Sequence, residues 1–391
     1  MSELKKEIEA EASSLVPSGL VPSGLVPSGL VPSGLVDECP DGVDVEKLIK
    51  MFGCKPFTED IVKKIEVVTG KKVPSLLAKG FISHRYFDEL LDSYEKGTRF
   101  YLYTGRGPSS QNLHLGHLLP FLVTRELQKL FDVKLVIQIT DDEKFLKRDL
   151  TLEQVRQYTE QNIKQIRALG FDPAKTFIFN DFNMTPAMYL NIIKIQSHIT
   201  VTHSMSSFGV KSTDSVGKVA FPATQIMPCL PSSFPEFFGP QEQNLRCLVP
   251  CGIDQDPYFR IAKDILHQVG APRPVLLHTT FVPSLSGVAT KMSSSKPESA
   301  IFLDETLQTL KKKIQKSFSG GRDTAEEHKR LGGRPEIDVA FKLVELFGDA
   351  NEVGRIRQEY QSGSLMTGQL KAKAVEIVFD LLKSCRGEGS N

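Results

Sequence analysis

The chain has 391 residues, of which 40% are hydrophobic and 24% charged, a composition typical of a globular protein with a core large enough for two or three domains. A formal net charge of +1 excludes an overall electrostatic attraction to nucleic acid, so any contact with RNA has to depend on local basic patches and on shape. No apolar run reaches membrane-spanning length, and the N-terminus is too rich in acidic residues for an organelle transit peptide, so we expect a cytoplasmic protein with no membrane contact.

The N-terminal segment, residues 1–40, is dominated by the sequence Leu-Val-Pro-Ser-Gly, which occurs four times in tandem over residues 15–34. Proline at every fifth position removes backbone donors, and glycine at the same period adds backbone freedom, so the repeat favours neither a helix nor an unbroken strand. We expect a low-complexity, flexible extension. The alternative is a peptide that a partner recognises through its Leu-Val pairs.

Residues 41–96 show apolar side chains at three-to-four-residue spacing, as in Ile61, Ile65 and Val68. This is the period of amphipathic helices, so the segment is predicted to form an N-terminal helical collar. Its expected role is simple packing against the domain that follows.

Strand and helix patterns alternate between residues 97 and 300, which predicts an α/β domain with a Rossmann-like, doubly wound parallel sheet. One helix is expected around residues 115–122 and another over 152–169. Such a sheet binds ligands beyond the carboxyl ends of its strands. The buried strands are expected at residues 100–103, 135–139, 177–179, 245–249 and 275–278.

The alternation is interrupted from about residue 186 to 240, where a helix predicted near residues 188–199 is followed by sequence rich in Gly, Ser and Pro. We interpret this stretch as an inserted segment. After residue 300 the pattern becomes helical again, which predicts a C-terminal α-helical domain over 301–391. Its lysines at 311, 312, 313 and 316 are either a solvated face or contacts to phosphate.

Six cysteines, at positions 39, 54, 229, 247, 251 and 385, are scattered without paired metal-ligand spacing. Cys247 and Cys251 lie four positions apart at the end of a predicted strand, but no second pair of ligands accompanies them. We interpret both as small core residues and expect reduced thiols.

Two short motifs, far apart in the chain, predict a site for ATP. The first, TGRGPSS at residues 104–110 followed by HLGH at 114–117, comes where a strand gives way to a helix, so that backbone N–H groups, a guanidinium and two imidazoles gather at a natural anion site. The second, KMSSS at 291–295, places a lysine and three hydroxyls on a loop after another strand. Alone, either motif could be a helix cap with a core histidine, or a solvated loop.

In this order, the two motifs resemble the signature motifs of class I aminoacyl-tRNA synthetases. Three longer strings, YLYTGRGPSS at 101–110, VIQITDDEK at 136–144 and IDQDPYFR at 253–260, resemble the eukaryotic type of tryptophanyl-tRNA synthetase, and the likeness runs from about residue 41 to 383. The resemblance implies activation of L-tryptophan with ATP, transfer to tRNA(Trp), and a homodimer. It also implies that the inserted segment helps form the dimer and receives the tRNA end, and that the C-terminal domain binds the anticodon.

Activation transfers an adenylyl group, a reaction in which the protein mainly positions groups and neutralises charge. We expect Mg²⁺ to accompany ATP and predict no metal-ligating residues in the protein. Many class members have a second lysine at the position of Ser294, so this loop carries less positive charge. We therefore expect Arg106 and Mg²⁺ to neutralise more of the phosphate charge. The catalytic groups are predicted to be Arg106, His114, His117, Lys291, Ser293 and Ser295, and further ATP contacts to be Thr104, Gly105, Gly107, Gly116, Met292 and Ser294.

An indole has one N–H donor and no acceptor, so its partner has to accept a hydrogen bond, as the Tyr103 hydroxyl and the Gln138 carbonyl can. We prefer Tyr103 to Tyr101 because it ends the predicted strand beside the ATP loop; a core tyrosine is the alternative. The resemblance supports Glu143, with Gln225 or Gln255, for the substrate ammonium and Asp254 for the ribose, and the division of roles among the glutamines stays open. Glu143 could instead be an exposed salt-bridge partner of a nearby lysine.

Two other functions are compatible with the same fold. A tyrosyl-tRNA synthetase shares the motifs, but a phenol both donates and accepts and calls for an acidic acceptor that we do not find here. An inactive RNA-binding relative is disfavoured by the intact Arg106, His114, His117 and Lys291. Because a pocket that bonds the indole N–H rejects smaller side chains strongly, we predict no editing site.

Overall fold

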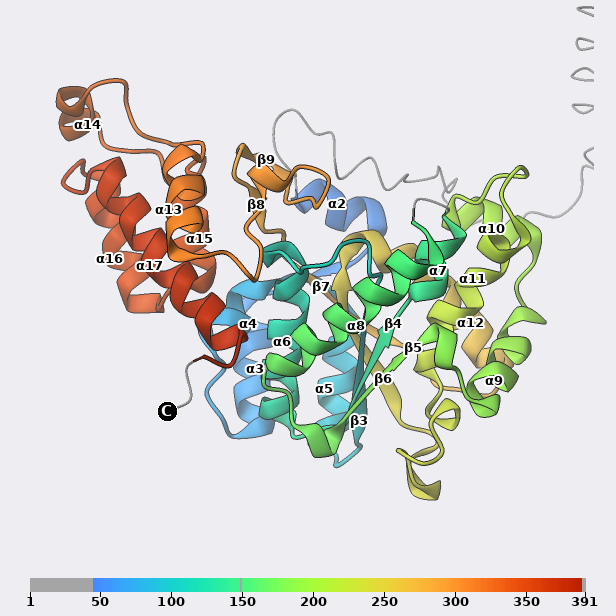
Figure 1. Ribbon diagram of the computed structural model, residues 1–391. Helices are drawn as coiled ribbons and strands as arrows, with labels where there is room; N and C mark the ends of the chain where they lie inside the picture. The colour runs from blue at the N-terminus through green and yellow to red at the C-terminus, as the bar shows by residue number, and fades with distance from the viewer. Residues whose placement is uncertain (1–44, 148–149, 389–391) are drawn as a thin grey trace, which may run out of the picture. The chain divides into compact units, whose positions relative to one another are not determined.

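The computed structural model describes residues 45–147 and 150–388, and a seven-stranded sheet lies at their centre (Figure 1). Its order is β1-β2-β7-β6-β3-β4-β5, and the last five strands run parallel to one another. These five confirm the predicted strands and the predicted α/β class. Their bounds are β3 (Phe100–Arg106), β4 (Leu135–Ile139), β5 (Thr176–Asn180), β6 (Arg246–Gly252) and β7 (Val275–Thr279).

The predicted end of β3 is wrong by three residues. Thr104, Gly105 and Arg106 continue the strand and pair with residues 137–139 of β4, so that Arg106 is the last strand residue and not part of a loop after it. The glycine within the strand concealed this continuation, because glycine normally weakens strands.

The prediction that residues 41–96 are helical throughout is also wrong in part. Four helices are present, but β1 (Lys55–Pro56) and β2 (Phe81–Arg85) join the sheet, and β2 pairs antiparallel with β7. Ser83 and His84 concealed this strand, because polar residues do not suggest a buried strand; Ser83 is buried, and its Oγ lies 2.8 Å from Nδ1 of His278 across the pair. The helices are α2 (Val45–Phe52), α3 (Glu59–Thr69), α4 (Ser75–Gly80) and α5 (Phe87–Glu95).

Successive side chains of the central strands point to opposite faces of the sheet, and each face has its own core. Leu102 of β3 and Ile137 of β4 pack with α6 (Leu115–Phe131) and with the C-terminal helices. Tyr101 and Tyr103 pack on the other face with α9 (Pro186–Gln196), α11 (Val216–Ile226) and α12 (Asp256–Gln268). The sheet is therefore doubly wound, and its strand ends lie between the two helical layers.

The inserted segment contains more helix than its composition predicted. The expected helix is α9 (Pro186–Gln196), which begins two residues early because the Thr185 hydroxyl caps it and Pro186 suits a first helical position. The stretch rich in Gly, Ser and Pro then forms α10 (Val201–Phe208) and α11 (Val216–Ile226). Thr200 and Ser215 act as N-caps for these helices, which is why residues that look like helix breakers start them.

The C-terminal part is helical, as predicted, after a short hairpin of β8 (Pro283–Ser284) and β9 (Gly287–Lys291). Within residues 45–147 and 150–388, no helix combines the length and apolarity needed to cross a membrane. The extension at 1–40, with its repeat, lies outside the described residues, and the domain boundaries stay predictions. The C-terminal helices are α13 (Leu307–Lys316), α14 (Ala325–Leu331), α15 (Val339–Phe347), α16 (Ala350–Gln361) and α17 (Thr367–Cys385).

Candidate active site

The two predicted ATP motifs lie side by side, although well over a hundred residues separate them. The Ser110 Oγ is 3.2 Å from the Ser294 Oγ. Immediately beside this contact, residues 301–303 pair with residues 113–115: the Leu115 N–H donates to the Ile301 carbonyl at 2.9 Å and the Leu303 N–H to the Leu113 carbonyl at 2.8 Å. These bonds hold the segment after the second motif against the start of α6.

Helix α8 (Leu152–Ala168) shapes the first loop from behind. Asn162 is fully buried; its Nδ2 donates to the carbonyls of Ser110 and Gln111, both at 3.0 Å, and its Oδ1 accepts from Nε of Arg106 at 3.3 Å. Gln165, one turn later, accepts from the Leu113 N–H. Neither residue was predicted from the sequence, but two amides at i and i+3 on the buried face of a helix were a usable signal.

Arg106 ends β3 at the mouth of this loop, and its Nη2 lies 3.3 Å from the Ser109 Oγ. Burial lowers the pKa of its guanidinium to about 10, which leaves it charged at neutral pH. A fixed cation with few protein anions near it suits an anionic ligand.

His114 and His117 are stacked at the start of α6, with ring centroids 3.5 Å apart. Burial, and then the charge of Arg106, lowers the pKa of His114 to about 3 and that of His117 well below its usual value, so both rings are neutral. The His114 backbone N–H makes a long bond, 3.5 Å, to Nδ1 of His117, which favours a proton on Nε2. Both ring nitrogens of His114 are buried without a hydrogen-bond partner among the described residues, so the ring is able to bond a ligand.

Two predicted glycines are required by close approach. A Cβ on Gly116 would lie 3.0 Å from the His114 ring and 3.7 Å from Cβ of Met292, so this glycine stands between the two motifs. A Cβ on Gly107 would lie 2.2 Å from Cε of Lys144. Lys144, which the sequence analysis did not single out, therefore reaches the phosphate-side loop.

The second motif begins at the last residue of β9. Lys291 is half-buried there, and Met292 is buried, with its N–H donating to the Val282 carbonyl at 3.3 Å. The hydroxyls of Ser293 and Ser295 are 2.8 Å apart. All three serine hydroxyls of the loop thus lie close to the first motif or to one another.

Tyr103 and Gln138 meet below the loop, on adjacent strands. The Tyr103 hydroxyl lies 2.6 Å from Oε1 of Gln138 and 3.0 Å from the Gln225 carbonyl, and its single proton can serve only one of them. Tyr101 instead donates to the Pro228 carbonyl and packs against Phe238, as a core tyrosine does. The preference for Tyr103 thus agrees with the geometry.

Two neighbours of this pair take part in strand contacts. The Thr104 hydroxyl donates to the Pro250 carbonyl of β6 at 3.1 Å, so it ties two strands together. Gly105 lies against β4: a Cβ there would approach the Gln138 carbonyl to 3.2 Å. The ATP contacts assigned to both residues stay predictions.

The remaining polar residues form two separate groups. Gln225 donates from Nε2 to Oε1 of Gln255 at 2.8 Å, and Gln255 donates to Oδ2 of Asp254 at 3.1 Å. Glu143 is not part of this chain: its oxygens lie 2.8 Å from Nζ of Lys144 and 2.7 Å from Nζ of Lys147. Burial acts to raise its pKa, but the two lysines outweigh burial and hold the pKa below its usual value.

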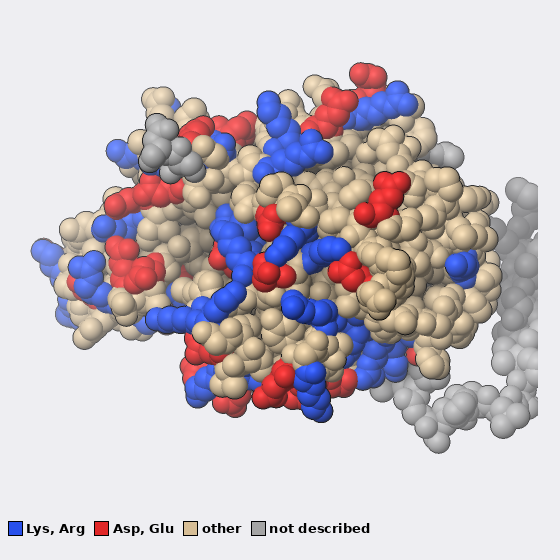
Figure 2. All heavy atoms as spheres, turned by 90° about the horizontal axis from the view of Figure 1, so that it is seen from below, with Lys and Arg blue, Asp and Glu red and all other residues tan. Residues whose placement is uncertain are grey.

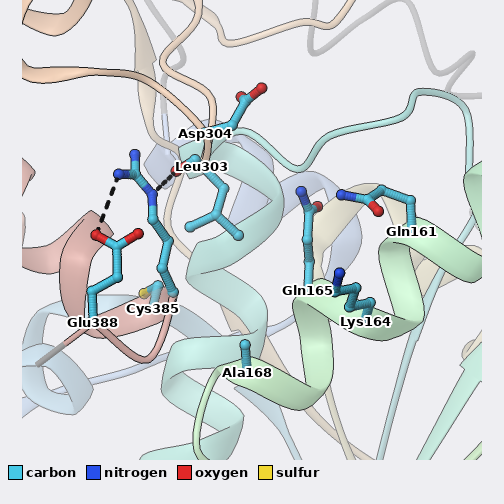
Figure 3. Close-up of a pocket in the computed structure, with 9 residues that line it drawn as sticks. Gln161, Lys164, Gln165, Ala168, Leu303, Asp304, Cys385 and Glu388 are labelled. Carbon is cyan, nitrogen blue, oxygen red and sulfur yellow. Dashed lines mark hydrogen bonds and ion pairs between the residues drawn. The ribbon is translucent and has the colours of Figure 1, made fainter. Parts of the chain in front are cut away.

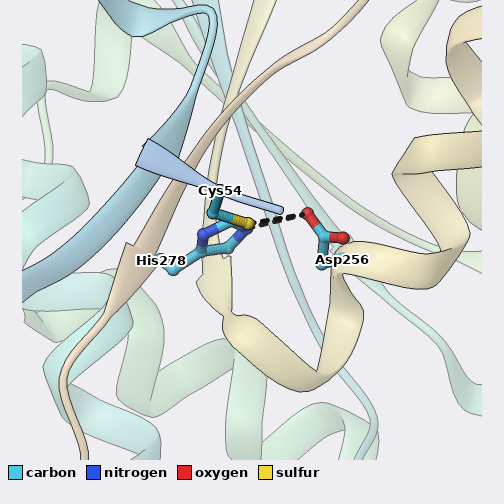
Figure 4. A group of neighbouring side chains, drawn as sticks. All are labelled: Cys54, Asp256 and His278. Carbon is cyan, nitrogen blue, oxygen red and sulfur yellow. Dashed lines mark hydrogen bonds and ion pairs between the residues drawn. The ribbon is translucent and has the colours of Figure 1, made fainter. Parts of the chain in front are cut away.

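Two other features lie outside this site. Cys54, Asp256 and His278 gather at the start of α12 (Figure 4), yet the Arg85 guanidinium already binds both oxygens of Asp256, at 2.5 and 2.8 Å, so a cation would meet a positive charge. A cavity of about 320 Å³ between α8 and the end of α17 contains none of the predicted site residues (Figure 3). Its wall includes Lys164 and Arg386.

Comparison with known proteins decides the family. The family model of the tRNA synthetases class I (W and Y) matches residues 95–383. The chain belongs to this synthetase family. It is 47% identical over 347 residues to the cytoplasmic tryptophan--tRNA ligase of Oryctolagus cuniculus, a match that covers 87% of this chain and 73% of that one.

Solved structures of such synthetases share the fold. The tryptophanyl-tRNA synthetase from Giardia lamblia superposes with a TM-score of 0.82 at 40% identity, covering 91% of this chain and 96% of that chain. The tryptophanyl-tRNA synthetase from Encephalitozoon cuniculi bound to tryptophan gives a TM-score of 0.82 at 37% identity, over 90% and 96% of the two chains. ATP is the substrate that members of this synthetase class use.

Proposed function

We propose that this protein activates L-tryptophan with ATP and transfers it to tRNA(Trp). The observation that carries the proposal is the meeting of the two motifs at Ser110 and Ser294, beside a half-buried guanidinium and two neutral imidazoles. The tryptophan--tRNA ligase names of the relatives favour tryptophan over tyrosine as the substrate. Because the relatives are named cytoplasmic, we assign the activity to the cytoplasm.

On the ATP side, each motif has a distinct task. Neutral His114 and His117 donate hydrogen bonds to phosphate oxygens, while Arg106 supplies fixed charge. Lys291 is assigned to the α-phosphate and the departing pyrophosphate, where negative charge grows in the transition state. The hydroxyls of Ser293 and Ser295 bind the phosphate tail, and Asp254 binds the ribose.

On the amino-acid side, the Tyr103 hydroxyl proton points to Gln138 and leaves oxygen lone pairs for the indole N–H. The ammonium group goes to Gln255 or Gln225, with Glu143 as the nearby negative charge. Both oxygens of Glu143 are paired with lysines, so this role requires one of those ion pairs to open.

Magnesium is assigned to the phosphate oxygens of ATP. The acidic residues Asp141, Asp142 and Asp181 lie close together, but Asp141 accepts from Asn180 and from two backbone N–H groups, and Asp181 accepts from Gln138. Because oxygens of Asp141 and Asp181 already accept internal hydrogen bonds, we assign the magnesium ion to ATP and not to this group.

We infer a homodimer formed through the inserted segment. Helix α9 exposes Tyr189, Leu190 and Ile193, and the first residue of α11, Val216, is 84% exposed. Figure 2 shows few charged side chains on the right-hand part of the visible face, whereas the rest of that face mixes both signs. A chain with such a surface normally covers it with a partner, and a second copy is the occupant the family resemblance implies.

The dimer is tested by sedimentation velocity. Leu190→Glu should convert the dimer to monomer, because a charge cannot be buried there without a partner. Val67→Glu is the matched control, since Val67 is 75% exposed on α3, away from α9–α11. A monomeric wild-type protein contradicts the inference.

The C-terminal helices are assigned to the anticodon end of the tRNA. Lys311, Lys312 and Lys316 of α13 are exposed and available to phosphate, whereas Lys313 is engaged within the protein.

The deciding experiment is amino-acid-dependent exchange of pyrophosphate into ATP. The chain contains no tryptophan, so the fluorescence of added L-tryptophan is free of protein background and reports binding separately. Exchange with tryptophan but not tyrosine is expected. The reverse result favours the tyrosyl alternative, and exchange with neither favours an inactive relative.

A further inference from the structure

Asp181 lies directly behind the proposed tryptophan pocket, although neither motif includes it. It follows β5 at the start of a short turn, Asp181–Asn183, and is 6% exposed. Its Oδ1 accepts a hydrogen bond from Nε2 of Gln138 at 2.8 Å. Its Oδ2 is buried and has no donor among the described residues.

Gln138 is fully buried, and its surroundings decide which way its amide faces. The amide nitrogen has two acceptors, Oδ1 of Asp181 and the Thr224 carbonyl at 3.1 Å, while the amide oxygen faces the Tyr103 hydroxyl at 2.6 Å. A reversed amide would place its oxygen against these two acceptors. It would also donate to the Tyr103 oxygen and occupy the lone pair that an indole N–H needs.

The amide nitrogen has one side-chain acceptor, Oδ1 of Asp181, and one backbone acceptor, the Thr224 carbonyl. Only the first can be changed by substitution. Neighbouring carboxylates lie close to Asp181: one oxygen each of Asp141, Asp142 and Asp181 lie within 4.8 Å of one another. Burial first, and then the charge of Asp142, raises the pKa of Asp181, and burial raises the pKa of Asp142 to about 6.

We propose that Asp181 is a positioning residue for tryptophan specificity: it fixes the Gln138 amide so that the Tyr103 oxygen is left as the acceptor for the indole N–H. This inference rests on the proposed function of the pocket. Asp181 does not touch the substrate itself. Its effect therefore appears in discrimination at the indole nitrogen and not in ATP binding.

The test compares L-tryptophan with β-(benzothiophen-3-yl)alanine, which has nearly the same shape but carries sulfur in place of the indole N–H. Pyrophosphate exchange gives kcat/KM for both. Wild-type protein should prefer tryptophan on the order of 10- to 100-fold, the usual effect of one buried hydrogen bond with its desolvated partner. Asp181→Ala should reduce this ratio to below about threefold, through the KM for tryptophan, with the KM for ATP unchanged.

Two further variants make the result specific. Asp181→Asn should keep most of the preference, because the asparagine Oδ1 can still accept from Gln138. Asn183→Ala changes an exposed residue on the same turn and should behave as wild type. If Asp181→Ala does not fold by circular dichroism, Asp181→Ser replaces it with the same expected loss, since serine leaves room for water.

An Asp181→Ala or Asp181→Ser protein that keeps the wild-type ratio overturns the inference. Equal loss with both amino acids and with ATP also overturns it, because that pattern belongs to general structural damage. If the wild-type protein itself does not distinguish the two amino acids, the pocket assignment in the proposed function fails instead, and the two failures are thereby separated.

Discussion

The neutral imidazoles of His114 and His117, at the proposed phosphate site, are the most informative result at the residue scale. A charged histidine pair would attract phosphate more strongly, but Arg106 and burial keep both rings uncharged. Their contribution is then directional, because each neutral ring donates one hydrogen bond at a set position. In the proposed site, the positive charge that neutralises the phosphates comes from Arg106, Lys144 and Lys291.

Gly107 leaves room for the end of the Lys144 side chain beside the first motif. Gly107→Ala places a Cβ against Lys144 and displaces its ammonium from the loop, so the KM for ATP should rise on the order of tenfold while tryptophan binding stays within twofold.

Gly354→Ala is the control for this change, because a Cβ at Gly354, within α16, meets nothing within 4 Å. That variant should keep its activity and gain about 0.5–1 kcal/mol in the free energy of unfolding, since alanine favours helix. Both changes are checked by exchange kinetics and urea unfolding. A normal KM for ATP in Gly107→Ala would show that Lys144 does not serve the phosphates.

At the scale of elements, α8 acts as a support for the first motif. Asn162→Ala removes three hydrogen bonds to the loop and to Arg106, and should lower kcat/KM for ATP on the order of 10- to 100-fold. Lys164→Ala, an exposed change on the same helix, should have no such effect. Thermal unfolding of both variants shows whether a loss of activity comes from the altered loop or from an unfolded protein.

Helix α13 is linked through Lys313 to the segment that follows the second motif. Its ammonium donates to the carbonyls of Pro297 and Ala300, both at 2.9 Å, pairs with Glu305, and lies over the ring of Phe302, which in turn contacts His114. One side chain thus joins the helical part to the segment that follows the second motif and, through Phe302, to His114 of the first.

Lys313→Met should lower the activation rate on the order of tenfold or more and leave tryptophan binding, measured by ligand fluorescence, nearly unchanged. Lys312→Met is the control, because Lys312 is exposed on the same helix. If both variants behave alike, the contacts of Lys313 contribute only to stability.

The sequence predicted those elements whose side chains follow one simple period. All five parallel strands are buried apolar runs, and they were found. β2 was missed because Ser83 and His84 are buried through partners that only the fold supplies, and α10 and α11 were missed because Ser and Thr start helices as readily as they end them. Predictions from composition fail where a polar residue's partner is distant in sequence.

The same reason limits the site. Arg106, His114, His117 and Lys291 lie in motifs whose residue types and spacing suggest their chemistry, and the two motifs meet at Ser110 and Ser294, while the roles of these residues stay predictions. Asn162 and Asp181 act through bonds to loops and strands forty or more positions away, so no local pattern indicates them.

At the scale of the whole molecule, buried histidines make the free energy of unfolding depend on pH. Burial lowers the pKa of His84 to about 4, against the influence of nearby Asp88 and with that of Lys55 and His278. The unfolded chain takes up this proton below about pH 6.5 and the folded chain does not, so stability is lost as pH falls from about 6.5 to 4.

His84→Gln should therefore reduce the pH slope of the unfolding free energy in this window by up to about 1.4 kcal/mol per pH unit. Carboxyl groups with raised pKa, such as Asp142, act in the opposite direction but are common to both proteins and cancel in the difference. Urea unfolding at several pH values measures the slope. Parallel curves for the two proteins would show that His84 is protonated in the folded state.

The pairing of residues 301–303 with residues 113–115 has a mechanical consequence. The chain around Ser293–Ser295 is anchored on one side where Met292 bonds Val282. On the other side Lys313 bonds the Pro297 carbonyl, and Ile301 bonds Leu115 beyond it, so only the four residues 293–296 lie between the two nearest anchors. Such a short tether permits a local flap over the triphosphate and forbids a wide swing. Closing over the nucleotide then needs no travel of the helices beyond residue 306, and each catalytic cycle reorganises only a small patch of backbone.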